Sequence, residues 1–164
     1  MRVLGIDPGT IATGLGLVTL KDGREHAEFV GTIYVQRKLP LPVRLKEIYH
    51  HLTAVIEKQR PTVVAIEASF YHKDVESALR LGQARSLSLL AAAEAGLEII
   101  EYPPARVKQA ICGNGRAGKE QVQYMVRKLL RLDRDPQVDA ADALSVALCN
   151  MYCHGKYSAI LSRK

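Results

Sequence analysis

Two kinds of apolar spacing divide the chain and predict an α/β fold. Short unbroken apolar runs occupy residues 3–6 and 62–66, and each run ends on a carboxylate, Asp7 or Glu67. Unbroken runs of this length predict strands buried on both faces, as in a parallel sheet. If these two strands are parallel neighbours, Asp7 and Glu67 emerge at the same edge of the sheet, where α/β folds bind ligands.

The remaining apolar positions predict three more strands and five helices. An Asp22-Gly23 turn between two strand-like runs predicts a hairpin, so we expect the chain to open as a three-stranded meander. The further strands are expected at residues 14–20, 26–35 and 97–102. Helices are expected over residues 43–58, 74–95, 103–112, 119–132 and 138–152. The expected architecture is a five-stranded mixed sheet, an antiparallel meander followed by parallel strands, flanked by helices.

The helix expected over residues 74–95 is apolar nearly all round. A helix of this kind must be covered on more than one side. In a chain of 164 residues, a second subunit is a candidate for that cover. We therefore expect the protein to self-associate.

Charge is distributed unevenly along the chain. The net charge is +6, from 23 Lys and Arg against 17 Asp and Glu. Between Tyr102 and Arg134, eight basic residues accompany two acidic ones, which accounts for the whole excess. Such a concentration is typical of a polyanion-binding surface, although a solvated helix face has a similar composition. The three cysteines form no CxxC motif, and no apolar run reaches the roughly 18 residues of a membrane span, so we expect a cytoplasmic protein without membrane contact.

Four carboxylates are candidates for chemistry: Asp7, Glu67, Asp139 and Asp142. Asp139 and Asp142 are three residues apart in the first turn of the last predicted helix, so they share one of its faces. An acid in that turn can simply stabilise the helix dipole. This explanation suffices for Asp139 but is weaker for Asp142, which interrupts an alanine-rich apolar segment.

A shared site for these carboxylates would require cations. Like charges that converge on a buried site repel each other, and divalent cations relieve that repulsion. An all-oxygen ligand set suits Mg²⁺ or Mn²⁺, and two such ions can clamp the attacking and leaving oxygens of a phosphodiester. On residue types alone, scattered structural acids remain an equal alternative.

Several motifs, taken in order, resemble those of RuvC-type Holliday junction resolvases. They are Gly5-Ile6-Asp7-Pro8-Gly9-Thr10 with Gly14-Leu15-Gly16, Ala65-Ile66-Glu67 with Phe70 three residues on, the segment 77–85, Val107-Lys108-Gln109, Ala117-Gly118-Lys119, and Asp139-Ala140-Ala141-Asp142-Ala143-Leu144. The resemblance extends from Met1 to about His154. One departure is Ala68, at a position where many relatives carry Gln directly after the second acid.

The resemblance implies an RNase H-like fold over residues 1–154. The polar composition of residues 155–164 predicts a flexible tail. It implies a homodimeric, metal-dependent endonuclease that resolves Holliday junctions during recombination and repair. Two opposed strands of the four-way junction would be nicked symmetrically. The family also implies cooperation with a branch-migration helicase complex.

Site roles carry over to the matching positions. The implied metal ligands are Asp7, Glu67, Asp139 and Asp142, with two Mg²⁺ or Mn²⁺ ions per site. Lys108 and Lys119 would lie near the scissile backbone, with Lys119 the catalytic candidate, and Phe70 would stack on an unpaired base unless it is a core aromatic. Arg116, in the glycine-rich basic loop 113–118, is a further candidate DNA contact. His72 and His154 receive no role.

Other function classes share parts of this pattern. Actin-like and sugar kinases also begin with a strand and an Asp-x-Gly-Thr loop that meets ATP phosphates. They need two such domains around a cleft, whereas this chain supplies one. Another RNase H-like nuclease, or a DNA-binding module without activity, would keep the basic region. Comparing cleavage of a four-way junction, an RNA/DNA hybrid and a linear duplex separates these alternatives.

Overall fold

The computed structural model describes residues 1–68 and 74–154. The strands are β1 (Arg2–Asp7), β2 (Ala12–Lys21), β3 (Arg24–Tyr34), β4 (Val63–Glu67) and β5 (Glu98–Tyr102). The helices are α1 (Leu41–Gln59), α2 (Val75–Glu94), α3 (Pro104–Cys112), α4 (Lys119–Leu130) and α5 (Val138–His154). Every expected element is present, with ends within two residues of the expected ones. Phe70, His72 and the tail 155–164 lie outside the described residues.

The five strands form one sheet in the order β3-β2-β1-β4-β5. β1 pairs antiparallel with β2, and β2 with β3, whereas β4 lies parallel to β1 and β5 parallel to β4. Asp22 and Gly23, in the turn between β2 and β3, both have positive φ, as an Asp-Gly hairpin predicts. The predicted mixed sheet is confirmed.

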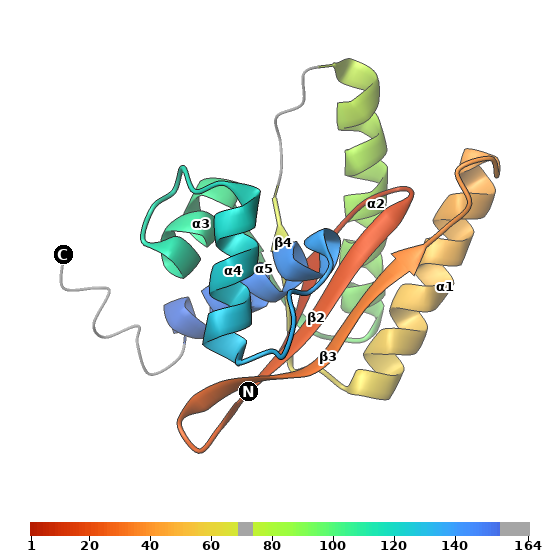
Figure 1. Cartoon of the computed structure of the whole chain (residues 1–164). Helices are drawn as coiled ribbons and strands as arrows, with labels where there is room; N and C mark the ends of the chain where they lie inside the picture. Colours follow the sequence, from red (N-terminus) through yellow and green to blue (C-terminus); the bar gives the residue numbers. More distant parts are fainter. Residues whose placement is uncertain (69–73, 155–164) are drawn as a thin grey trace.

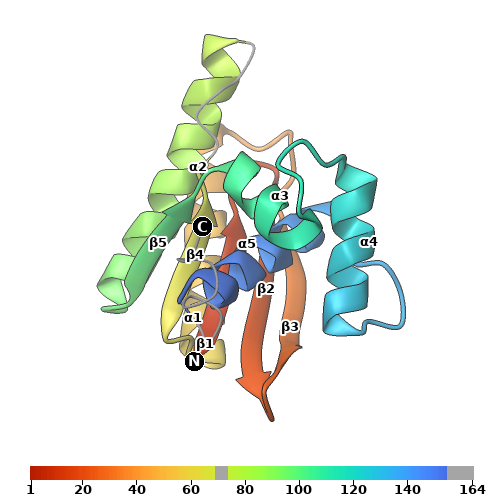
Figure 2. The ribbon, with the colours of Figure 1, turned by 90° about the vertical axis from the view of Figure 1, so that its left-hand side faces the viewer.

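Helices cover both faces of the sheet. In Figure 1, α3, α4 and α5 lie on one face and α1 and α2 on the other, and Figure 2 shows α5 lying across the strands. Each face has its own apolar core, with Val3 on the α5 side and Leu4 on the α1 side. Successive strand residues point to opposite faces, and both faces are covered here. This explains why β1 is an unbroken apolar run. Among the described residues, no helix has the length and hydropathy needed to cross a bilayer.

Glycines in β1 and β2 allow α5 to pack at very close range. A Cβ atom on Gly5 would overlap the carbonyl oxygen of Ala143, and one on Gly14 would overlap that of Asp139. A Cβ on Gly16 would lie 2.6 Å from Cδ2 of Leu144. Glycine inside a strand typically marks such a close approach of another segment. The position of α5 is therefore set by contact with the strand backbone.

α2 is covered less than its composition predicted. Its buried residues are Ala84, at the midpoint of the helix, and Ser88, Ala91 and Ala92, in its second half. Arg85 and Glu101 fix the middle of α2 to β5 through two contacts of 2.5 Å, Nε to Oε1 and Nη2 to Oε2. Val75 and Leu79, in the first half, are 76% and 63% exposed, and Figure 1 shows this half extending beyond the sheet. Within the described residues, the buried positions of α2 lie on one side of the helix, and none precedes Ala84.

Candidate active site

The ends of β1 and β4 place two predicted site residues next to each other. Ile6 pairs with Ile66 in the parallel register, so Asp7 and Glu67 are the next residues along both strands. Neighbouring strands lie about 4.8 Å apart. The two carboxylates therefore leave the sheet side by side at its carboxyl edge, and the expectation of parallel neighbouring strands is confirmed.

The first turn of α5 reaches the same edge. Asp7 pairs with Gly14 of β2 on its other side, and Gly14 lies directly against the backbone of Asp139. α5 therefore begins on the strand that neighbours Asp7. Asp142, three residues further on, shares a helix face with Asp139. Carboxylates from the two ends of the chain thus come together at one place.

Asp7 interacts with all three of the other carboxylates. Burial raises the pKa of Asp7 from its ordinary value of 3.8 to about 8, and repulsion from Asp142, Glu67 and Asp139 adds to the rise. Lys119 acts in the opposite direction, because its positive charge stabilises the Asp7 carboxylate. A large pKa shift produced by burial together with specific charged neighbours is typical of functional sites.

The structure brings both predicted lysines within electrostatic range of these carboxylates. Burial raises the pKa of Asp142, Lys119 lowers it, Asp139 raises it and Lys108 lowers it. Lys119 is the first residue of α4, and Lys108 lies on α3. Arg116 is exposed in the loop between these helices, where its backbone N–H donates to Oδ1 of Asn114 at 3.0 Å. Within the described residues, no contact joins the Arg116 side chain to the carboxylates.

The chemistry of the donor set fits a hard divalent cation. Carboxylate oxygens are the ligands that Mg²⁺ and Mn²⁺ prefer. As they stand in the described part of the chain, no three His, Cys, Asp or Glu side chains are arranged closely enough to hold one ion. A cation would have to draw the carboxylates closer together. Its charge would remove the repulsion that raises the pKa of Asp7.

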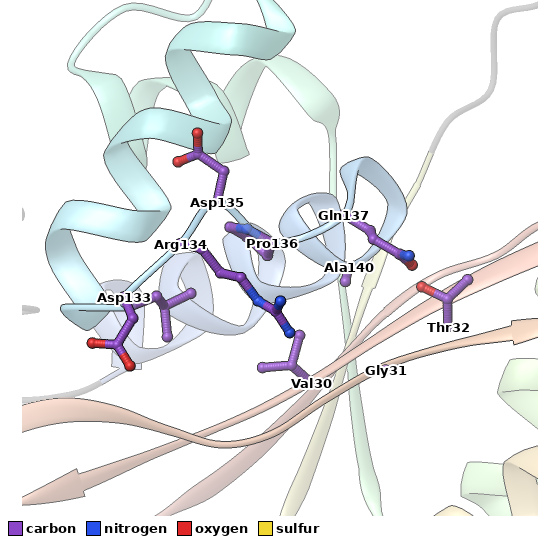
Figure 3. Close-up of a pocket in the computed structure, with 10 residues that line it drawn as sticks. Val30, Gly31, Thr32, Asp133, Arg134, Asp135, Pro136, Gln137 and Ala140 are labelled. Atoms are coloured by element: carbon purple, nitrogen blue, oxygen red, sulfur yellow. The ribbon is translucent and has the colours of Figure 1, made fainter.

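A cavity of about 760 Å³ lies beside the site, between β3 and the segment that leads into α5. Its lining residues are Val30, Gly31, Thr32, Leu132, Asp133, Arg134, Asp135, Pro136, Gln137 and Ala140. In Figure 3, Arg134 extends towards Val30, whereas Asp135 points away; Oδ1 of Asp135 lies 3.0 Å from Nε of Arg127 on α4. None of the four predicted carboxylates lines this cavity, so the candidate active site lies at the sheet edge instead.

Two features near the site were not predicted from the sequence. One is the contact of α5 with Gly5 and Gly14, for which a glycine inside an otherwise apolar strand was the available signal. The other is the burial of Arg44, which is 8% exposed and contacts the loop after Asp7. The available sequence signal for this burial was the position of Arg44, one helical turn before Ile48 on the apolar face of α1.

The sequence of this chain matches a known protein family. Residues 3–150 match the family model described as crossover junction endodeoxyribonuclease RuvC. The chain belongs to the RuvC family. RuvC of Halorhodospira halophila is 49% identical over 152 residues, which cover 92% of this chain and 90% of that relative. The resemblance stated from the motifs is thereby confirmed.

Solved RuvC structures agree with the fold. Thermus thermophilus RuvC has a TM-score of 0.85 and 35% identity, with 93% of this chain and 95% of that chain covered. T. thermophilus RuvC in complex with Holliday junction substrate has a TM-score of 0.84 and 33% identity, with 93% and 94% covered. The RNase H-like fold expected from the resemblance is confirmed.

Proposed function

We propose that this protein is a Holliday junction resolvase, which nicks two opposed strands of four-way DNA symmetrically during recombination and repair. Membership of a family of crossover junction endodeoxyribonucleases supports the reaction class. The related T. thermophilus protein in complex with a junction supports the substrate. The observation in this chain that carries the proposal is Asp7, a buried carboxyl among three others whose pKa rises to about 8. Ionising a buried carboxyl among three others is costly. Divalent cations that act on a phosphodiester would offset that cost and so explain why the four carboxylates are grouped.

The four carboxylates are the proposed metal ligands. Asp7, Glu67, Asp139 and Asp142 would hold two divalent cations, Mg²⁺ or Mn²⁺. When bound, these ions supply positive charge at the attacking and leaving oxygens and make a water molecule nucleophilic at neutral pH. Asp7 interacts with each of the other three carboxylates, which supports a shared ligand set that includes all four.

Lys119 and Lys108 are the proposed partners of the DNA backbone at the scissile phosphate. Both lysines lower the pKa of Asp142, so both act at the carboxylate edge. Lys119 opens α4, and the N-terminus of a helix adds partial positive charge there. Lys119 thus stabilises the negative charge that develops on the phosphate during cleavage. Phe70, which stacks on an unpaired base, and Arg116, which contacts the backbone, complete the proposed DNA contacts.

The first half of α2 is the proposed dimer interface. Val75 and Leu79 are 76% and 63% exposed beside a hollow of about 510 Å³ on this helix. A second copy of the chain would bury these apolar side chains, which favours association. A two-fold symmetric dimer also suits a substrate with two equivalent strands to cut. Cooperation with a branch-migration helicase complex is proposed from the family resemblance alone.

A cleavage assay with three substrates tests the proposed function. A four-way junction, a linear duplex of the same arm sequence and an RNA/DNA hybrid are each incubated with the full chain in Mg²⁺ or in EDTA. We expect paired nicks at symmetric positions in opposed strands of the junction, and only with Mg²⁺. Preferential cutting of the hybrid would favour another RNase H-like nuclease. Junction binding without cutting would favour a DNA-binding module.

A further inference from the structure

Arg44, which is 8% exposed, is the only charged residue among the buried residues in the described part of the chain. Its Nη1 donates a hydrogen bond of 3.1 Å to the carbonyl oxygen of Thr10, whereas its Nε is buried without a hydrogen-bond partner. None of the ion pairs among the described residues involves Arg44. A buried guanidinium without a carboxylate partner costs folding free energy.

The position of Arg44 in α1 adds to that cost. Arg44 lies in the first turn of the helix, and this turn contains no acidic residue. The partial positive charge at a helix N-terminus repels a cation. Further along, the same face of α1 buries Ile48, Leu52 and Ile56, so an apolar side chain would suit the position better. The stability of α1 therefore does not account for an arginine here.

The contact made by Arg44 falls on the loop between Asp7 and β2. Thr13 holds one end of this loop, because its hydroxyl donates to the carbonyl oxygen of Gly9 at 2.8 Å and accepts from the Gly9 N–H at 3.3 Å. The N–H of Val35 holds the other end through the carbonyl oxygen of Ile11 at 3.0 Å. Arg44 holds Thr10, which lies between these two anchored residues.

We propose that Arg44 is a positioning residue for cleavage, whose guanidinium fixes the loop after Asp7 and thereby the direction in which Asp7 leaves β1. This inference rests on the proposed nuclease function. Arg44 acts through the backbone, since its charge is not among those that shift the pKa of Asp7. A misplacement of about 1 Å in a reacting group can cost on the order of 100-fold in rate. Loss of one loop anchor is therefore expected to slow cleavage.

Arg44→Met tests this role, because it keeps an unbranched apolar stem and removes the guanidinium. We expect single-turnover cleavage of a junction to fall about tenfold or more, with the junction Kd in EDTA unchanged within about twofold. Hydrogen exchange at the Val35 amide should be faster by about tenfold, because the loop that accepts its hydrogen bond has lost an anchor. Thermal unfolding should stay within about 3 °C of the parent Tm. Lys46→Met removes an exposed charge from the same helix and is the matched control.

Other outcomes would overturn the role. Cleavage at the parental rate would contradict it, and a loss of junction affinity equal to the loss of rate would make Arg44 a DNA contact instead. If Arg44→Met does not fold, Thr13→Val is the second test of whether anchoring this loop matters for cleavage. It removes the hydroxyl that holds the same loop at Gly9. Faster Val35 exchange in that variant without slower cleavage would overturn the proposal. Failure of the parent chain to cut junctions would count against the proposed function, and Val35 exchange would still report whether Arg44 anchors the loop.

Discussion

α5 and α2 lie on opposite faces of one sheet and are buried to very different extents. Eleven of the 17 residues of α5 are buried, against four of the 20 in α2. The cause lies in the strands beneath α5, where Gly5, Gly14 and Gly16 let the helix approach the strand backbone. No comparable glycine contacts lie beneath α2 in the described residues. α2 packs mainly against α1, and Arg85 joins it to β5.

This difference separates two tasks. α5 carries two of the candidate metal ligands, and backbone contact leaves it little freedom to shift relative to Asp7. α2 carries exposed apolar side chains, which leaves its outer half available for a partner. The sheet thus combines a tightly placed helix, which carries part of the proposed metal site, with a loosely covered one, which carries the proposed dimer interface.

The largest expected effect concerns the α5 side. Asp7→Asn should reduce Mg²⁺-dependent junction cleavage by at least about 1,000-fold, because the amide cannot supply a charged ligand. Junction affinity measured in EDTA should remain close to that of the parent chain. Asp133→Asn, which alters an exposed acid outside the carboxylate group, is the control. Full cleavage by Asp7→Asn would remove Asp7 from the proposed site.

The packing of α5 is tested by adding one methyl group beneath it. Gly5→Ala should lower the free energy of unfolding by about 3 kcal/mol, because the new Cβ overlaps the backbone of Ala143. Gly16→Ala should cost less, since its nearest contact is a terminal methyl of Leu144. Urea unfolding of both variants measures the two values. Equal and small losses would show that α5 is free to move off the sheet.

On the α2 side, Leu79→Lys should weaken self-association. Burial of one such side chain contributes about 1.5–3 kcal/mol, so we expect the dimer Kd to rise roughly 10- to 100-fold. Sedimentation at several concentrations gives the Kd. Val30→Lys, on edge strand β3, changes another exposed apolar residue and should leave the Kd unchanged. A parent chain that is already monomeric would contradict the proposed interface.

The pH dependence of stability gives a smaller effect on the α5 side. With its pKa raised to about 8, Asp7 keeps its proton in the folded chain and loses it near pH 4 in the unfolded chain. In EDTA, the unfolded chain therefore binds fewer protons between these values, and stability falls as pH rises. Asp7→Asn should melt about 5 °C higher than the parent at pH 8.5, with the gap closing towards pH 4. Added Mg²⁺ should stabilise the parent and not the variant. A Tm difference between the two chains that does not change with pH would contradict the burial of the Asp7 carboxylate.

The smallest expected effect is a gain in stability on α2. Gly82 lies inside the helix, and a Cβ added there meets no atom within 4 Å. Gly82→Ala should therefore stabilise the chain by about 0.5–1 kcal/mol through helix propensity. Urea unfolding of Gly82→Ala in a Leu79→Lys background measures this gain without any contribution from self-association. A loss of stability would show that α2 is packed as tightly as α5.

The elements and their order could be predicted because their signals are local. Apolar runs ending at Asp7 and Glu67, and the spacing of residues within each helix, depend only on neighbours in the sequence. The meeting of Asp139 with Asp7 could not be derived this way, since it depends on how α5 crosses the sheet. The motif resemblance supplied that relation, and the register of β1 with β4 and the contact at Gly14 give its physical basis.

Other expectations had a different outcome. The composition of the helix at residues 74–95 predicted cover on more than one side, which the described residues do not supply, and a second subunit remains a prediction. Burial of a charged residue at Arg44 was not predicted: its position on the apolar face of α1 indicated burial, but hydrophobic patterns place charges outside the core. The contact of Phe70 with DNA also stays a prediction, as does the tail over residues 155–164.

The contact between Gly5 and Ala143 also has a consequence for the order of events during synthesis. A ribosome releases β1 long before it makes α5, and domains complete their folding only when their distant segments have emerged. Until then, the chain carries Asp7 and Glu67 without Asp139 and Asp142. A nascent chain that has not yet released α5 therefore lacks two of the four proposed metal ligands.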